Sequence, residues 1–263
     1  MIQKAALAAA TLVLLGCGGE RKERFEPPTT GRFVAEYAPA SPEFEAFRDE
    51  LRAHRFLDTI VLRLNDSLRI PKDITLATGH CVEPNASFDP ETRRVTLCYE
   101  LFKWLSEEFE DEVGGEYLVS GTVVFALMHE LGHALIEVLE LPIVGREEDA
   151  VDQLATILLL NQGPTGDSLA FGAVGWLAIN ATTNPLDDFA FADDHGLDRQ
   201  RVYNIICWIY GRAPDRYPEV VGEGWLPENR AERCRSEYLR LARSWDRLLG
   251  PHRRGPPASP LGP

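Results

Sequence analysis

The segment His129-Glu130-Leu131-Gly132-His133 lies within the apolar stretch Tyr117 to Leu141, which ends before Pro142. The length and hydropathy of this stretch predict a buried helix. Residues four apart share one face of a helix, so both imidazoles can reach a single ion, while Glu130 points beside it. An unpaired polar group in a core is costly, and a metal ion is one partner that offsets this cost. The pattern H-E-x-x-H therefore predicts His129 and His133 as zinc ligands and Glu130 as a general base.

A second predicted helix, Glu147 to Leu160, supplies candidates for a third ligand. The 15 residues from the second histidine to Glu148 allow the first helix to end and the second to return antiparallel to it. Glu148 and Asp152 are four residues apart and therefore share a face. Glu147 and Glu137 are alternatives to Glu148, but neither has this spacing to Asp152.

The combination of H-E-x-x-H with E-x-x-x-D resembles the gluzincins, the thermolysin-like zinc peptidases. The resemblance implies that Glu148 completes a His₂Glu site with His129 and His133, and that Asp152 orients His129. General zinc chemistry agrees, because catalytic zinc has three protein ligands and its histidines have a second hydrogen-bond acceptor. Gluzincins also often use a downstream His or Tyr to hold the oxyanion, a role for which His195 is the candidate. A structural or exposed histidine is the alternative interpretation of His195.

Further motifs extend the resemblance along the chain. They are Gly79-His80-Cys81, Thr96-Leu97-Cys98-Tyr99-Glu100, the His/Glu helix, Gly145 to Ala155, and Asp194-His195 to Asn204. Together they resemble a family of bacterial exported metallopeptidases over most of residues 32–248. This resemblance implies a helix-dominated, zincin-like metallopeptidase domain with a small β-sheet.

The hydropathy pattern itself indicates a helix-dominated α+β domain. Strands are predicted at Asp73–Thr78 and Arg94–Cys98, with Asn85–Thr92 as the connection. One further helix is predicted from Ser41 to Leu64, with Pro42 in its first turn. The remaining predicted helices are Tyr99–Glu110, Ser168–Asn180, Asp198–Tyr210 and Glu228–Leu249.

The first residues have the pattern of an export signal. Lys4 precedes the apolar run Ala5 to Leu15, which is too short to span a bilayer. Leu14-Leu15-Gly16-Cys17 resembles the lipobox of bacterial lipoproteins, which implies a signal peptide over residues 1–16 and a lipid on Cys17. A plain secretory signal is the alternative.

The residue after Cys17 is Gly18, not the Asp associated with retention at the inner membrane. We therefore expect an exported protein that is lipid-anchored to the cell envelope, at the outer membrane and facing the periplasm. Residues 17–31 are expected to form a flexible tether and 32–250 the zincin-like domain. The Pro- and Gly-rich residues 251–263 are expected to form a disordered tail.

Four cysteines remain beyond Cys17: Cys81, Cys98, Cys207 and Cys234. An even number in an exported chain indicates disulfides, for which three pairings are possible. Cys81 and Cys98 bracket a turn region, so we pair them, and this leaves Cys207 with Cys234. Four free thiols are the alternative, and without C-x-x-C spacing a cysteine zinc site is poorly supported.

Charge and motifs together narrow the function. A formal net charge of −14 argues against nucleic acid, because phosphate-binding surfaces collect Lys and Arg. We expect an exported zinc metallopeptidase that hydrolyses peptide or amide bonds, with the strand ending at Cys98 as an edge strand that pairs with a peptide or protein substrate. A zinc-binding scaffold lipoprotein with little turnover is the alternative, and a lipoprotein without metal is a third possibility. His80 is expected to be structural, and Arg199, Arg201 and Tyr203 to be helix-surface or ion-pair residues.

Overall fold

The computed structural model describes residues 30–183 and 188–255. Its strands are β1 (Phe33–Tyr37), β2 (Ile74–Gly79), β3 (Ala86–Asp89) and β4 (Arg94–Cys98). Its helices are α1 (Glu45–Ala53), α2 (Phe56–Ser67), α3 (Tyr99–Glu108), α4 (Gly115–Leu139), α5 (Glu147–Leu160), α6 (Pro164–Thr183), α7 (Asp188–Ala192), α8 (Asp198–Arg212), α9 (Glu219–Gly222) and α10 (Glu228–Leu249), with the short 3-10 helices η1 (Pro214–Arg216) and η2 (Gly250–His252). The predicted helix-dominated α+β class with a small sheet is confirmed. The predicted signal peptide, Cys17 and most of the tether lie outside the described residues.

The strands form one mixed sheet in the order β1-β2-β4-β3. β1 pairs with β2 and β2 with β4 in parallel, whereas β3 runs antiparallel to β4. The tight turn from β3 to β4 is held by Asp89, whose carboxylate accepts hydrogen bonds from the amide of Glu91 and the hydroxyl of Thr92. This order places β4 inside the sheet and β3 at its edge, so the prediction that β4 is an edge strand is wrong.

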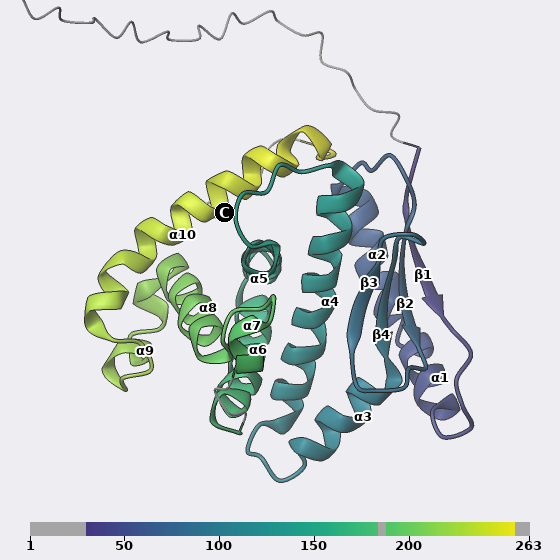
Figure 1. The fold of residues 1–263 in the computed structure, drawn as a ribbon, viewed down its shortest axis with the longest axis horizontal. Coiled ribbons are helices and arrows are strands. Elements are labelled where there is room, and N and C mark those ends of the chain that lie inside the picture. Colours follow the sequence, from purple (N-terminus) through teal and green to yellow (C-terminus); the bar gives the residue numbers. More distant parts are fainter. Residues whose placement is uncertain (1–29, 184–187, 256–263) are drawn as a thin grey trace, which may run out of the picture.

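Helix α4 is the central element of the domain. Figure 1 shows the sheet on one side of α4 and the helices α5, α6, α8 and α10 on the other. Leu127, Leu131 and Leu135 are fully buried, and a stretch of 18 residues in α4 is apolar enough to cross a membrane but is 72% buried within the domain. A helix that is apolar on all sides must be covered on all sides, which explains why α4 lies between the layers.

Gly132 allows α5 to pack closely against α4. A Cβ at this position would lie 2.9 Å from both Cβ and Cγ1 of Val151, a fully buried side chain of α5. Real side-chain carbons do not approach one another this closely, so any larger residue would displace one of the two helices. The absence of a side chain at Gly132 thus brings the first turn of α5 beside the two histidines of α4.

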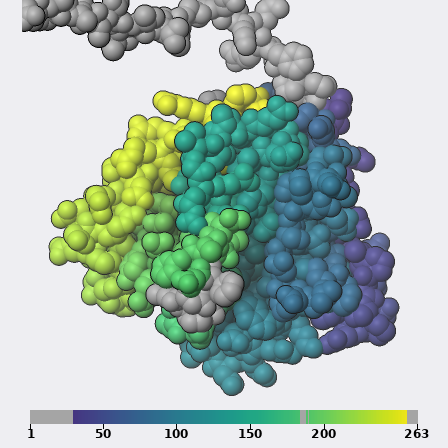
Figure 2. All heavy atoms as spheres, in the orientation of Figure 1, coloured from purple at the N-terminus to yellow at the C-terminus, as the bar shows by residue number. Residues whose placement is uncertain are grey.

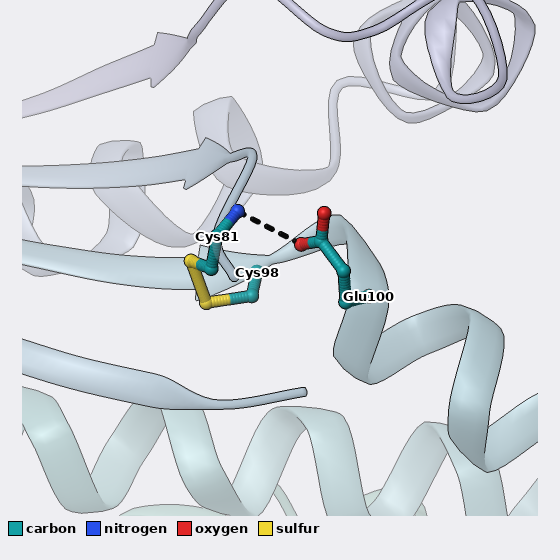
Figure 3. A group of neighbouring side chains, drawn as sticks. All are labelled: Cys81, Cys98 and Glu100. Atoms are coloured by element: carbon teal, nitrogen blue, oxygen red, sulfur yellow. Dashed lines mark hydrogen bonds between the residues drawn. A yellow bond between two sulfur atoms is a disulfide. The ribbon is translucent and has the colours of Figure 1, made fainter. Parts of the chain in front are cut away.

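Both predicted disulfides are present. Cys81 is bonded to Cys98, which ties the segment after β2 to the end of β4, and Cys207 is bonded to Cys234, which joins α8 to α10. Figure 3 shows that the Glu100 carboxylate accepts a hydrogen bond from the Cys81 amide. The donor atoms of Cys81, Cys98 and Glu100 lie close enough together to hold a metal. The two sulfurs are bonded to each other, however, so this group stabilises the fold as a disulfide.

Several elements of the structure differ from those predicted from the sequence. β1 and β3 were not expected as strands, and the helix predicted from Ser41 is two helices, α1 and α2, separated at Arg55, whose φ of 54° is left-handed. The predicted start at Ser41 is also wrong, since α1 begins at Glu45. By contrast, α5, α10 and β4 have the predicted bounds.

The folded domain extends beyond the predicted boundaries at both ends. Gly31 donates a backbone hydrogen bond to Ile70, so the predicted tether ends before residue 31. After α10, the carbonyl of His252 accepts a hydrogen bond from Arg69, and the amide of Arg254 donates to Ser67. The predicted disorder is therefore wrong for residues 251–254, while residues 256–263 lie outside the described residues.

We predict that Gly132→Ala separates α5 from α4. The added methyl group meets Val151, so the variant should lose about 1–3 kcal/mol of unfolding free energy and bind divalent metal more weakly. Urea unfolding and metal titration measure the two effects. The control is Gly222→Ala, because a Cβ there meets nothing within 4 Å. Equal stability and equal metal affinity in the two variants would contradict the role given to Gly132.

Candidate metal centre

Two histidines of α4 and one glutamate of α5 converge on one point. Single donor atoms of His129, His133 and Glu148 all lie within 4.8 Å of one another. The His129 Nε2 atom is 3.0 Å from Glu148 Oε2, and the His133 Nε2 atom is 3.4 Å from Glu148 Oε1. The two imidazoles and the carboxylate thus face a common centre, which is the arrangement that a divalent cation requires.

Each imidazole is also held from its other side by a carboxylate. His129 Nδ1 is 2.9 Å from Asp152 Oδ1, and His133 Nδ1 is 2.7 Å from Glu147 Oε1. Such an acceptor fixes the ring orientation and directs the remaining nitrogen, Nε2, toward the centre. Asp152 therefore contacts His129, as the resemblance implied. Glu147, considered above as an alternative ligand, instead contacts Nδ1 of His133, the nitrogen that faces away from the centre. Glu137, the other alternative, is exposed on α4.

The contacts within this group shift the pKa values of its members. Burial raises the pKa of Glu148, but hydrogen bonds with His129, His133 and His195 outweigh burial and hold this pKa far below its ordinary value. Burial lowers the pKa of His133, while hydrogen bonds to Glu148 and Glu147 raise it to about 9. Protons on the imidazoles thus supply the positive charge that a bound cation would supply in their place.

Arg201 fixes Asp152 from the side opposite to His129. Its Nε donates to Oδ2 at 2.8 Å and its Nη2 to Oδ1 at 2.9 Å, forming a two-point contact between α8 and α5. Burial raises the pKa of Asp152, but hydrogen bonds from His129 and Arg201 outweigh it and lower this pKa to about 2. The ion-pair role predicted for Arg201 is therefore confirmed, and its side chain, only 12% exposed, contacts the carboxylate that holds His129.

His195 lies next to the same centre, on the segment between α7 and α8. Its Nε2 atom is 3.0 Å from Glu148 Oε2, and its ring stacks on that of His129 with 5.6 Å between centroids. Asp193 accepts from both the backbone amide and Nδ1 of His195. Arg146 Nη2 donates to the carbonyls of Asp193, Asp194 and His195 at 2.9–3.0 Å. The loop that carries His195 is therefore anchored on both sides, a role for Arg146 that no sequence pattern revealed.

A large cavity of about 940 Å³ adjoins the centre. Its wall includes His129, Glu130 and His195 on the metal side, and the chain from Glu83 to Ala86, which leads into edge strand β3. Figure 2 shows the surface hollowed between the atoms of the α7–α8 region (green) and those of the β3 region (blue). Burial raises the pKa of Glu130, so the cavity wall contains a carboxylate of increased basicity next to His129.

The remaining candidate residues lie outside the metal centre. Arg199 and Tyr203 are exposed residues of α8, as predicted, and both line the cavity. His80 pairs with Glu100 beside the disulfide, away from the metal centre, in keeping with a structural role.

Comparison with known proteins identifies the class. The model of a family described as "Putative metallopeptidase" (DUF4344) matches residues 37–249. Because this match covers most of the chain, the protein belongs to that family, and membership implies a bound metal. Searches of curated proteins and of solved structures found no match.

We predict that Glu148→Gln abolishes metal binding. The amide removes the negative charge that contacts the imidazoles, and the loss should exceed the roughly 100-fold that removal of an outer partner costs. Elemental analysis of purified protein and competition with a chelator measure it. Glu137→Gln, on the exposed face of α4, is the control for the same chemical change and should retain full metal content. Retention of metal by the Glu148 variant would exclude Glu148 as a ligand.

Proposed function

We propose that this protein is a zinc-dependent peptidase that hydrolyses peptide or amide bonds. The observation that carries the proposal is the convergence of His129, His133 and Glu148, together with a substrate-sized cavity whose wall contains His129 and Glu130. Membership of a metallopeptidase family supports the same reaction class.

The donor set and its spacing support zinc as the metal. Two imidazole nitrogens and one carboxylate oxygen match the His₂Glu ligand set of catalytic zinc. In a tetrahedral site with bond lengths of about 2.0–2.2 Å, neighbouring donors lie about 3.3–3.6 Å apart. The separation of 3.4 Å at His133 fits directly, and that of 3.0 Å at His129 needs only a slight widening. Bound there, zinc supplies a Lewis acid that polarises a carbonyl and lowers the pKa of water.

Glu130 is suited to move the proton in this reaction. Its carboxylate accepts a proton from the attacking water as the water oxygen bonds to the scissile carbonyl carbon. When the C–N bond breaks, the same carboxyl group returns the proton to the leaving nitrogen, so the chain regains its starting state. The raised pKa caused by burial makes Glu130 a stronger base than an exposed glutamate.

His195 is suited to stabilise the oxyanion that forms during the attack. It adjoins Glu148 on the cavity side, and its Nε2 can donate a hydrogen bond toward the centre while Nδ1 is held by Asp193. The contact with Glu148 raises the pKa of His195, which favours the protonated, donating form.

The edge strand β3 is the element best placed to bind an extended substrate. Its pairing with β4 leaves its other side without a strand among the described residues, and the preceding residues Glu83 to Ala86 line the cavity. A peptide added along β3 would form main-chain hydrogen bonds and lie across the metal centre. This role replaces the one first expected of β4.

We predict that Glu130→Gln retains zinc and loses hydrolysis. The amide preserves shape but cannot accept the proton, so turnover should fall by at least about 100-fold. Zinc content and cleavage of a broad peptide library are measured on wild type, on this variant and on Glu137→Gln, which should resemble wild type. Turnover that survives in the Glu130 variant would remove this residue from the mechanism. Zinc-loaded wild type that cleaves nothing would favour a binding or scaffold protein.

Export and lipid anchoring through Cys17 complete the proposal. They are supported by the lipobox-like segment and by the two disulfides, which persist in oxidising compartments. We predict that the mature protein isolated from a bacterial membrane begins at Cys17 with a mass increased by acyl chains, and that Cys17→Ser releases it. Mass spectrometry of the mature N-terminus tests this, and an unprocessed N-terminus would refute it.

A further inference from the structure

We propose that the end of the domain at which the chain leads toward Cys17 is a membrane-binding face that contacts anionic phospholipid headgroups. This inference rests on the export and lipid anchoring proposed above, and it names the partner surface and the orientation of the domain on it. The observation that carries it is a cluster of cations in a chain whose formal net charge is −14.

Three segments that are distant in sequence meet at this end of the domain. The amide of Gly31, before β1, donates to the carbonyl of Ile70. The amide of Arg69 donates to the carbonyl of His252, which joins the segment before β2 to the end of α10. Figure 1 shows the beginning of β1 and the end of α10 at the same end of the molecule, at the top of the view. We call this surface the basic face, and it consists of residues 30–32, 66–73 and 243–255.

The charge of the basic face is opposite to that of the whole chain. The face contains seven Arg or Lys residues and three Asp residues, whereas the chain has 27 basic and 41 acidic residues. Two of the three acids are already engaged, because Asp73 accepts a hydrogen bond from the Arg32 amide and Asp246 pairs with Arg253. The seven cations are Arg32, Arg69, Lys72, Arg243, Arg247, Arg253 and Arg254.

Most of these cations have no carboxylate partner. Among the residues that the structure describes, only Arg253 of the seven forms a salt bridge. The side chains of Lys72 and Arg247 are exposed and form no hydrogen bond or ion pair with the described part of the chain. Burial lowers the pKa of His252, and the neighbouring charge of Arg69 lowers it further, as expected in a positive environment. Uncompensated cations that are gathered on one surface favour contact with anionic headgroups.

The sheet contributes two further acids at this end. Asp89 and Glu91 belong to the turn between β3 and β4, and the order β1-β2-β4-β3 places this turn at the edge opposite to β1. Neighbouring strands are about 4.8 Å apart, so about 10–14 Å separate the turn from the segment before β1. Because this distance exceeds the Debye length of about 8 Å at physiological salt, the two acids do not neutralise the basic face.

The position of the proposed anchor identifies the partner as a membrane. The chain from Cys17 to Thr30 advances 13 residues, which span at most about 45 Å when fully extended. This chain enters the domain at the basic face, so a lipid on Cys17 would keep this end of the domain near the bilayer. A lipid and a polybasic surface together give stable membrane binding, whereas either one alone gives weak binding.

This orientation holds the cavity away from the bilayer. Lys72 precedes β2, so the basic face lies at the beginning of this strand. Ala86 lines the cavity and pairs with Leu97 of β4, which is the register partner of Thr78 near the end of β2. The length of β2 up to this point, about 13 Å, separates the basic face from this wall of the cavity. The enzyme would then act on polypeptides in the aqueous space beside the bilayer.

The first test measures binding to vesicles without the lipid anchor. The protein that begins at residue 17 and carries Cys17→Ser cannot be acylated there, so binding comes from the protein surface. We expect it to bind vesicles of phosphatidylglycerol and phosphatidylcholine at about 0.1 M salt and to be released at about 0.5 M salt, where charges are screened. Vesicles of phosphatidylcholine alone should not bind it. Equal binding to both kinds of vesicle overturns the proposal, and so does binding to a short DNA strand without binding to vesicles.

The second test uses charge reversal to locate the binding surface. Lys72→Glu combined with Arg247→Glu should weaken binding to phosphatidylglycerol vesicles at least about 25-fold, because each cation near an anionic bilayer contributes about fivefold. The matched control is Arg52→Glu combined with Arg235→Glu, which makes the same change in net charge at exposed positions outside the basic face. Arg52 and Arg247 each lie in the last turn of a helix. Equal loss of binding in the two double variants overturns the proposal.

These experiments separate the basic face from the lipid anchor. If the mature N-terminus is acylated but vesicle binding does not depend on phosphatidylglycerol, the anchor stands and the basic face fails. If the N-terminus is unprocessed but the Cys17→Ser protein binds phosphatidylglycerol vesicles through Lys72 and Arg247, the anchor fails and the basic face stands. Unchanged thermal unfolding of each variant shows that the fold is intact.

Discussion

The contact of one carboxylate with three imidazoles governs this structure. Glu148 lies between His129, His133 and His195, which come from α4 and from the loop before α8. Further acids surround the same histidines, so the group is stable only if it contains compensating positive charge. Either protons on the imidazoles or a bound divalent cation would provide it. The electrostatic requirement thus explains why these side chains converge at all.

That convergence depends on how closely two helices can approach. Gly132 lies between the histidines in sequence and opposite Val151 in space, so one residue of the H-E-x-x-H segment controls the distance between ligands on α4 and α5. On its outer side α5 is held to α8 through Asp152 and Arg201. Packing and charge therefore act on the same few residues, since the Asp152 carboxylate that orients His129 also joins α8 to α5.

The parts of the site that could be predicted from sequence share a helical spacing of four residues. The pair His129 and His133 on α4 and the pair Glu148 and Asp152 on α5 are each placed on one face by the geometry of their own helix. The sequence alone is therefore enough to predict them. Glu147, Arg146 and Arg201 could not be assigned in this way, because long side chains reach partners that only the fold brings near. The strands divide similarly. β4 alternates apolar and polar residues, whereas β3 has only four residues and forms by hairpin pairing with β4, and β1 depends on pairing with the distant strand β2. The break between α1 and α2 occurs at Arg55, whose backbone is left-handed, and the residue type there does not predict it.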